Sequence, residues 1–316
     1  MSTDSPSPLR IAYFGLPLGA LLLSRDGHRL EPCVLSPVDG PGLRRVRRVL
    51  GSRVLEANSL GSELESAVDA ALVRAAPDLV VSWFWTRKLP VRWLERGRLG
   101  ALGVHPSLLP RHRGPNPYFW AIDAGDTETG VTVHRLEAEY DTGAILDREA
   151  IGVGTRNAWQ LARALDRPSL VALRRTVQRF AQGQLPSEEP QVDEQATQAP
   201  EPSGALLHVD FGWTTPRVLR RIRALSPVPG LALTLAGMPF FVTHAQAADG
   251  FVATLEPGEA QIAGERLLLR TADGAISVER ATAESELDDA LDLTGSELAC
   301  ALIERLESRG AKSFKD

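Results

Sequence analysis

One stretch of the sequence indicates the fold class most directly: Gly103-Val104-His105-Pro106-Ser107-Leu108-Leu109-Pro110-Arg111-His112-Arg113-Gly114. It is preceded by an apolar run that begins at Leu99, and such a run is typical of a buried strand in an α/β sheet. His105 therefore falls at the carboxyl end of a strand, before a loop rich in proline. Ligands of open α/β sheets bind outside those strand ends, so this position predicts a functional histidine.

Short apolar runs alternate with helical patterns on both sides of this stretch, which predicts a parallel sheet and an α/β fold. Residues 131–136 alternate apolar and polar side chains, as expected for a strand with one buried face, and His134 is expected on the exposed or cross-strand face. Gly15-Leu16-Pro17 lacks the Gly-x-Gly-x-x-Gly pattern, so a dinucleotide site is not expected. Further strands are predicted at 9–14, 32–36, 79–82 and 99–104, and helices at 63–75 and 157–182.

With 316 residues, of which 43% are hydrophobic, the chain is long enough for two domains. Residues 185–204 are rich in Pro, Glu, Gln and Ser and contain few large apolar side chains, which indicates an interdomain linker. We expect a first domain over 1–183, a linker over 184–205 and a second domain over 206–316.

The second domain is predicted to be a small β-barrel, because its short β-prone runs are separated by Gly, Pro and Asp turns. A closing helix is expected from Thr294 to Glu307, and Thr294 with Glu297 forms the pattern of a capping box. The β-prone runs cover 231–235, 240–244, 251–255, 266–270 and 275–279.

The charge distribution argues against a general polyanion binder. The chain has a formal charge of −5, and residues 201–316 carry 11 Lys and Arg against 17 Asp and Glu, a net of −6. The basic cluster at 44–48 is either a solvated helix face or a contact for an anionic substrate. Two distant cysteines, Cys33 and Cys300, suggest neither a disulfide framework nor a metal site. Without an apolar leader or membrane-length run, we expect a soluble cytoplasmic protein with no membrane partner.

Three separate blocks carry a resemblance to a known family: HPSLLPRHRG at 105–114, ETGVTVH at 128–134 and DTGAIL at 141–146. Their order and spacing resemble the formyltransferase family that uses 10-formyltetrahydrofolate. The run from Arg221 to Gly230 is similar to the start of that family's C-terminal domain. The resemblance implies a Rossmann-like first domain with a parallel-rich sheet, and a small OB-like barrel as the second domain.

Formyl transfer requires two tasks: a developing oxyanion must be neutralised, and the attacking amine must lose a proton. A histidine and a nearby carboxylate can perform them. His105 and Asp141 fit these roles, and by resemblance they match the family's catalytic pair. Ser107 either positions His105 or is a turn residue, and Thr142 is expected in the turn that aims Asp141 inward.

The co-substrate site is expected beside this pair. The aromatic residues after the strand at 79–82 either wall a site for a flat ring or belong to the core. By resemblance, folate binds the loop from Trp83 to Pro90 and the loop before Asp141, mainly through backbone groups. The candidate contacts are Trp83, Phe84, Trp85, Leu89 and Pro90.

One position departs from the family, which has Asn-x-His where this chain has Gly103-Val104-His105. An oxyanion donor of this kind is worth about 2.7 to 4 kcal/mol, and glycine has no side chain to replace it. Three explanations are open: another donor such as Asn116 reaches in, a substrate group or water fills the gap, or the reaction has changed.

The first functional hypothesis is transfer of a formyl group from 10-formyltetrahydrofolate to an amine of a small molecule, such as an amino sugar, an amino acid or a biosynthetic intermediate. The alternative is methionyl-tRNA formylation, with residues 44–48 in contact with the tRNA; the acidic second half argues against it. A third hypothesis is a folate-binding or repurposed protein that has lost or altered catalysis through Gly103.

Overall fold

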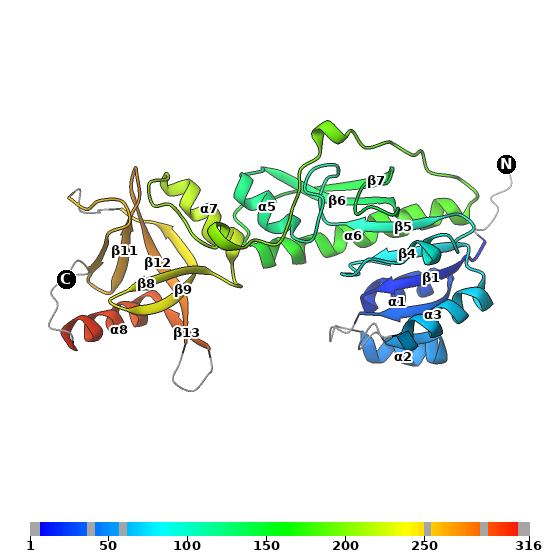
Figure 1. Cartoon of the computed structure of the whole chain (residues 1–316), viewed down its shortest axis with the longest axis horizontal. Helices are drawn as coiled ribbons and strands as arrows, with labels where there is room; N and C mark the ends of the chain where they lie inside the picture. Colours follow the sequence, from blue (N-terminus) through cyan, green and yellow to red (C-terminus); the bar gives the residue numbers. More distant parts are fainter. Residues whose placement is uncertain (1–6, 37–41, 57–61, 250–253, 285–289, 309–316) are drawn as a thin grey trace. The chain divides into compact units, whose positions relative to one another are not determined.

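The computed structural model describes residues 7–36, 42–56, 62–249, 254–284 and 290–308 (Figure 1). The chain divides into two compact units, and each unit is assembled from separate segments. Unit 1 comprises Met1–Pro117, Glu128–Gly152 and Ala164–Ala199. Unit 2 comprises Tyr118–Thr127, Val153–Arg163 and Pro200–Asp316.

Unit 1 is built on a seven-stranded sheet with the strand order β3-β2-β1-β4-β5-β6-β7. Strands from β3 to β5 run parallel, whereas β6 is antiparallel to both β5 and β7. This is the parallel-rich sheet that the apolar runs predicted. The strands are β1 (Arg10–Gly15), β2 (Arg29–Leu35), β3 (Val54–Glu56), β4 (Leu79–Trp83), β5 (Ala101–His105), β6 (Glu128–Arg135) and β7 (Ile145–Gly152).

Helices cover both faces of this sheet. Phe14 and Val80 pack in an apolar cluster with side chains of α3 and α4 on one face. On the other face, Trp83 Nε1 donates to Ser169 Oγ of α6 at 2.9 Å, and the same indole lies against Gly19 of α1. Layers on both faces give the Rossmann-like arrangement. The helices of unit 1 are α1 (Pro17–Arg25), α2 (Leu43–Leu50), η1 (Gly51–Arg53), α3 (Ser62–Ala75), α4 (Val91–Leu94) and most of α6 (Ala158–Ala181). Helix α5 (Pro117–Ala124) belongs almost entirely to unit 2.

Helix α6 follows the sequence prediction closely. Asn157 Oδ1 accepts from the backbone N–H of Gln160 at 2.8 Å, so Asn157 caps the start of the helix. The helix continues without a break through Pro168. Within the described part of the chain, none of the helices combines the length and apolarity that crossing a membrane requires.

Unit 2 contains a curled antiparallel sheet, a half-barrel that fits the small β-barrel expected from the β-prone runs. Strands β10-β11-β12-β9-β8 follow one another, and β13 pairs with β12 (Figure 1). The predicted run at 251–255 falls mostly outside the described residues. The strands are β8 (Leu231–Leu235), β9 (Met238–Ala247), β10 (Ala260–Ala263), β11 (Arg266–Arg270), β12 (Ala275–Glu284) and β13 (Ala290–Thr294).

Two α-helices accompany this sheet, α7 (Thr215–Leu225) and α8 (Gly295–Ser308). The backbone N–H of Thr294 donates to Glu297 Oε2 at 2.8 Å, and the backbone N–H of Glu297 donates to Thr294 Oγ1 at 3.3 Å. The predicted capping box of the last helix is therefore confirmed. The short 3-10 helices are η2 (Asp193–Gln195) and η3 (Gly204–Leu207).

The segment after α6, up to Ala199, packs as part of unit 1. Glu189 bridges to Ile145, and Gln198 bridges to Arg113 in the loop after β5. Ala199 is fully buried. A stretch with the composition of a linker thus has defined hydrogen-bonded partners.

Candidate active site

The site is organised by the pairing of β5 with β6. Gly103 lies opposite His134, and His105 lies opposite Thr132. Because strand side chains alternate between faces, Ala101, Gly103 and His105 share one face of β5. Ala101 belongs to the apolar cluster beneath α3 and α4, so this face is the one that those helices cover.

His105 is the last residue of β5, as predicted, and it is almost fully buried. Its Nε2 lies 2.8 Å from the carbonyl oxygen of His112. A carbonyl oxygen only accepts, so Nε2 carries a proton and donates it. In the neutral ring, Nδ1 is then the basic nitrogen, and it lies 3.5 Å from Asp141 Oδ2. The structure brings the two predicted catalytic residues together.

Asp141 sits in a constrained turn. Its φ of +57° is left-handed, a region that non-glycine residues rarely occupy. The backbone N–H of Gly114 donates to Asp141 Oδ2 at 2.9 Å, and Thr142 Oγ1 donates to the carbonyl of Glu139 at 3.3 Å. At Gly143, a Cβ atom would lie 2.1 Å from the carbonyl oxygen of Arg135, so only glycine fits. The Asp-Thr-Gly sequence makes the turn that aims the carboxylate inward.

A second histidine flanks the same carboxylate. His134 lies on the cross-strand face and is buried, so of the two predicted placements the exposed one is wrong. Its Nδ1 donates to the carbonyl of Arg135 at 2.8 Å, and its Nε2 lies 3.7 Å from Asp141 Oδ1. Burial lowers the pKa of His134 from its ordinary value of 6.5 to about 4, although Asp141 acts in the opposite direction.

The space beside Gly103 is filled by neighbouring side chains. A Cβ atom on Gly103 would lie 2.5 Å from a methyl carbon of Leu136 and 3.1 Å from His134 Nε2. The first distance is shorter than real contacts allow, so an asparagine here requires Leu136 to move. The region that a longer side chain on residue 103 would enter is therefore occupied by an apolar group and an imidazole.

The two remaining loop residues have different surroundings. Ser107 is fully buried, and its hydroxyl donates to the carbonyl of Arg111 at 2.6 Å, which closes the loop that returns to His105. The backbone N–H of Asn116 donates to the carbonyl of Ala199 at 3.0 Å. The use of the Asn116 side chain as a replacement oxyanion donor stays a prediction.

The predicted folate contacts are buried or half-buried. Trp83 and Leu89 are buried, and Phe84 stacks on Trp83 with ring centroids 4.9 Å apart. Trp85 packs edge-on against Phe14 in the core. None of these side chains, nor that of Pro90, lines the cavity described next. Their assignment to the folate site stays a prediction.

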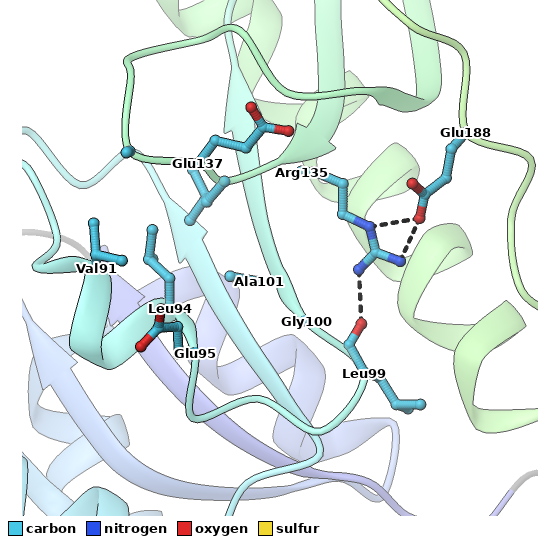
Figure 2. A pocket seen from close by; sticks show the side chains of 11 residues that line it. Val91, Leu94, Glu95, Leu99, Gly100, Ala101, Arg135, Glu137 and Glu188 are labelled. Atoms are coloured by element: carbon cyan, nitrogen blue, oxygen red, sulfur yellow. Dashed lines mark hydrogen bonds and ion pairs between the residues drawn. The ribbon is translucent and has the colours of Figure 1, made fainter.

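A cavity of about 430 Å³ opens on the same face of β5 (Figure 2). Val91 and Leu94 of α4 line one side. Across from them, the Arg135 guanidinium donates to Glu188 Oε1 at 2.6 and 2.8 Å and to the carbonyl of Leu99 at 2.7 Å (Figure 2). The remaining lining residues are Glu95, Gly100, Ala101, Leu136, Glu137 and Ala138. The cavity thus lies between the helix after the Trp83 to Pro90 loop and the segment that leads to Asp141.

Sequence reasoning missed two residues of this site, Gln191 and Thr197. The Gln191 amide donates to the carbonyls of Asp141 and Gly143, both at 2.8 Å. Thr197 Oγ1 accepts from the backbone N–H of His112 at 2.8 Å. Both occur in the polar stretch after α6, where neither periodicity nor a local motif distinguishes them.

Comparison with protein families gives two matches. The model described as "Formyl transferase" matches residues 37–163, and the one described as "Formyl transferase, C-terminal domain" matches residues 205–288. A methionyl-tRNA formyltransferase of Bordetella pertussis is 37% identical over 227 residues, covering 71% of each chain. One from Anaeromyxobacter dehalogenans is 32% identical over 307 residues, covering 89% of this chain and 96% of the relative.

Solved structures share the fold at lower identity. HypX from Aquifex aeolicus, in complex with tetrahydrofolic acid, aligns with a TM-score of 0.66 at 21% identity, covering 95% of this chain. This chain spans about half of HypX, 48% of its length. WlaRD, a sugar 3N-formyl transferase crystallised with dTDP and 5-N-formyl-THF, aligns with a TM-score of 0.64 at 14% identity, covering 85% of this chain and 97% of WlaRD.

Proposed function

This chain belongs to the formyl transferase family, and from that premise we propose that it transfers a formyl group from 10-formyltetrahydrofolate to an amine of a small molecule. The observation that carries the proposal is the pairing of His105 with Asp141 on the sheet face that also borders the cavity. Neither residue of the pair lines the cavity, so the proposal requires the co-substrate to reach from the cavity along β5 to the pair.

The cavity suits the co-substrate in size and chemistry. Its volume falls within the roughly 300 to 1,000 Å³ of small-molecule sites. Val91, Leu94 and Ala101 offer apolar surface to a flat ring, and the backbone of 136–138 offers polar groups at its edge. Ala101 lies four residues before His105 on β5, which corresponds to about 13 Å along a strand. A single methylene joins the ring of the co-substrate to the nitrogen that carries the formyl group, so the proposal places the ring at the end of the cavity nearer to His105.

The chemistry of this pair follows from its hydrogen bonds. With Nε2 of His105 donating to His112, the lone pairs of His105 Nδ1 and Asp141 Oδ2 face each other across 3.5 Å. The pair can therefore take up one proton, and the attacking amine has one to lose. The resulting imidazolium beside the carboxylate would neutralise the negative charge that develops on the formyl oxygen as the amine adds to the formyl carbon. When the bond between that carbon and N10 of the co-substrate breaks, the proton taken from the amine can pass to N10, which leaves as tetrahydrofolate.

A small-molecule acceptor is supported by the acidic residues 201–316, which would repel a phosphate backbone. The rival acceptor is methionyl-tRNA. It is supported by the names of the curated relatives and by the exposed arginines Arg44, Arg45 and Arg48 on α2, which could contact phosphates.

The deciding experiment offers 10-formyltetrahydrofolate with three classes of acceptor: nucleotide-linked amino sugars, free amino acids and methionyl initiator tRNA. Formylated products are identified by mass spectrometry. A formylated small amine supports the proposal, whereas salt-sensitive binding and formylation of the tRNA alone would replace it with the rival. Binding of folinic acid without any formylated product would favour the third hypothesis, a folate-binding protein with lost or altered catalysis.

Replacement of either catalytic candidate tests the mechanism. His105→Ala and Asp141→Ala should each lower kcat by about 10² to 10⁴, because each removes a group that handles the proton. His244→Ala, at an exposed histidine of unit 2, serves as the control. Turnover close to wild type in either alanine variant, in steady-state assays of folded protein, would refute the assignment.

A further inference from the structure

The stretch from Gln191 to Ala199 lies along the loop that follows β5. Gln198 and Arg113 form a parallel bridge. The backbone N–H of Arg113 donates to the carbonyl of Thr197 at 2.8 Å, and the N–H of Ala199 donates to the carbonyl of Arg113 at 2.6 Å. Residues about 80 positions apart are thus paired like a short piece of sheet, and the polar stretch becomes a wall of the active site.

Within this stretch, both the nitrogen and the oxygen of the Gln191 side-chain amide form hydrogen bonds. Its Nε2 donates to the carbonyls of Asp141 and Gly143 at 2.8 Å each. Its Oε1 accepts from Arg113 Nη2 at 2.9 Å and Nε at 3.1 Å. Two donors and two acceptor positions are the full capacity of a glutamine amide, so the side chain has one orientation in which every bond is satisfied.

The turn at Asp141 is a place where such bonds matter. A left-handed φ at a non-glycine residue costs of the order of 1 kcal/mol and persists only where the surroundings impose it. Gln191 holds the carbonyls of residues 141 and 143, which lie on either side of Thr142. The carboxylate that emerges from this turn is the one facing His105.

The same stretch also supports the histidine. Thr197 Oγ1 accepts from the backbone N–H of His112, and the carbonyl of His112 accepts from His105 Nε2. Two residues six positions apart therefore reach the two partners of the catalytic pair: Gln191 through the Asp141 turn and Thr197 through His112.

We propose that Gln191 is a positioning residue which, with Arg113 and Thr197, braces the Asp141 turn and the His112 loop so that the carboxylate and His105 face each other. The brace is a property of the folded chain, and only its effect on turnover rests on the proposed function. It also gives the polar stretch after α6 a role in unit 1 in addition to joining the two domains.

Gln191→Glu in the full chain separates the contact of residue 191 with Arg113 from its two hydrogen bonds to the Asp141 turn. Glutamate keeps an acceptor for Arg113, now as a carboxylate, so the fold retains that contact. It has no N–H groups, so both bonds to the Asp141 turn are lost. The matched control is Gln195→Glu, the same chemical change at an exposed glutamine four residues further along.

The first measurement is amide hydrogen exchange at Gly114, whose N–H donates to Asp141 Oδ2. We expect exchange at Gly114 to quicken by about fivefold to tenfold in Gln191→Glu, as for loss of one hydrogen bond, and to stay unchanged in Gln195→Glu. Thr197→Val tests the contact with the His112 loop. It removes the hydroxyl that accepts from the His112 N–H, so we expect faster exchange at His112. Exchange at Gly114 within about twofold of wild type in Gln191→Glu would overturn the brace.

The second measurement is steady-state turnover of 10-formyltetrahydrofolate with the acceptor that the product screen identifies. In Gln191→Glu, kcat should fall about tenfold while KM for the co-substrate changes by less than about twofold. The reason is that a misplaced catalytic group slows the chemical step without weakening co-substrate binding. Faster exchange with unchanged kcat would overturn the positioning role. If wild type formylates no amine, the proposed function fails, and the exchange data still decide whether the brace exists.

Discussion

At the scale of single residues, Gly103 stands where the resemblance predicts an asparagine, and its surroundings make the effect of that side chain testable. Its Cβ position is occupied by the end of the half-buried Leu136 side chain, which must move, so Gly103→Asn should destabilise the protein by about 1 kcal/mol, the low end of the cost of overpacking. Urea unfolding measures this cost. Leu136→Ala opens the space, and the double variant should recover most of the stability that Gly103→Asn loses relative to Leu136→Ala alone. A Gly103→Asn protein as stable as wild type would contradict the steric account.

His134 makes stability depend on pH. Its pKa is about 4 in the folded protein and 6.5 ordinarily, so the unfolded chain binds the proton more readily between these values. The stability that His134 contributes as a neutral imidazole is complete above pH 6.5 and is lost as pH falls toward 4. With about 1.4 kcal/mol per pH unit, wild type should lose about 2 kcal/mol more than His134→Gln between pH 6.5 and 5 in urea unfolding. His244→Gln, the same change at an exposed histidine, is the control.

At the scale of elements, α4 and the segment before Asp141 form the two sides of the cavity. Val91→Trp places an indole at the mouth of the cavity, and Val73→Trp places the same indole on the exposed face of α3; the two valines are 44% and 62% exposed. The Kd of folinic acid should rise by at least about tenfold in the first variant, or 1.4 kcal/mol, and stay constant in the second. Equal affinities of the two variants for folinic acid, measured by calorimetric titration, would show that folate binds outside this cavity.

The elements also show how far the sequence alone could lead. Apolar runs placed β1, β2, β4 and β5 because central parallel strands are buried on both faces. Strand β7 was missed because its Asp147 and Glu149 look solvated in sequence, whereas Arg175 pairs with both. Gln191 was missed for a related reason: its partners lie about 50 and 80 residues away, and composition does not encode such pairings.

At the scale of the whole chain, each compact unit is assembled from segments that are distant in sequence. Composition divides the chain at 183 and 205, whereas residues 184–199 cluster with unit 1 and residues 118–127 cluster with unit 2. The predicted domain limits at 183 and 205 therefore remain a proposal, namely that residues 206–316 fold stably without the segments that precede them. Asp123 tests it, because this residue precedes the predicted second domain and yet belongs to unit 2.

Asp123 is buried and accepts paired hydrogen bonds at 2.6 to 3.0 Å from Arg217 and Arg221 of α7. Burial acts to raise the pKa of Asp123, but the bonds from these arginines overcome it and hold the pKa below its ordinary value. Asp123→Ala leaves the buried Arg221 charge without its carboxylate and should cost about 3 to 5 kcal/mol in urea unfolding. Asp249→Ala, at an exposed aspartate of the same unit, is the control. If both variants unfold like wild type, residues 206–316 are self-sufficient without Asp123, and the division at 205 stands as a physical boundary.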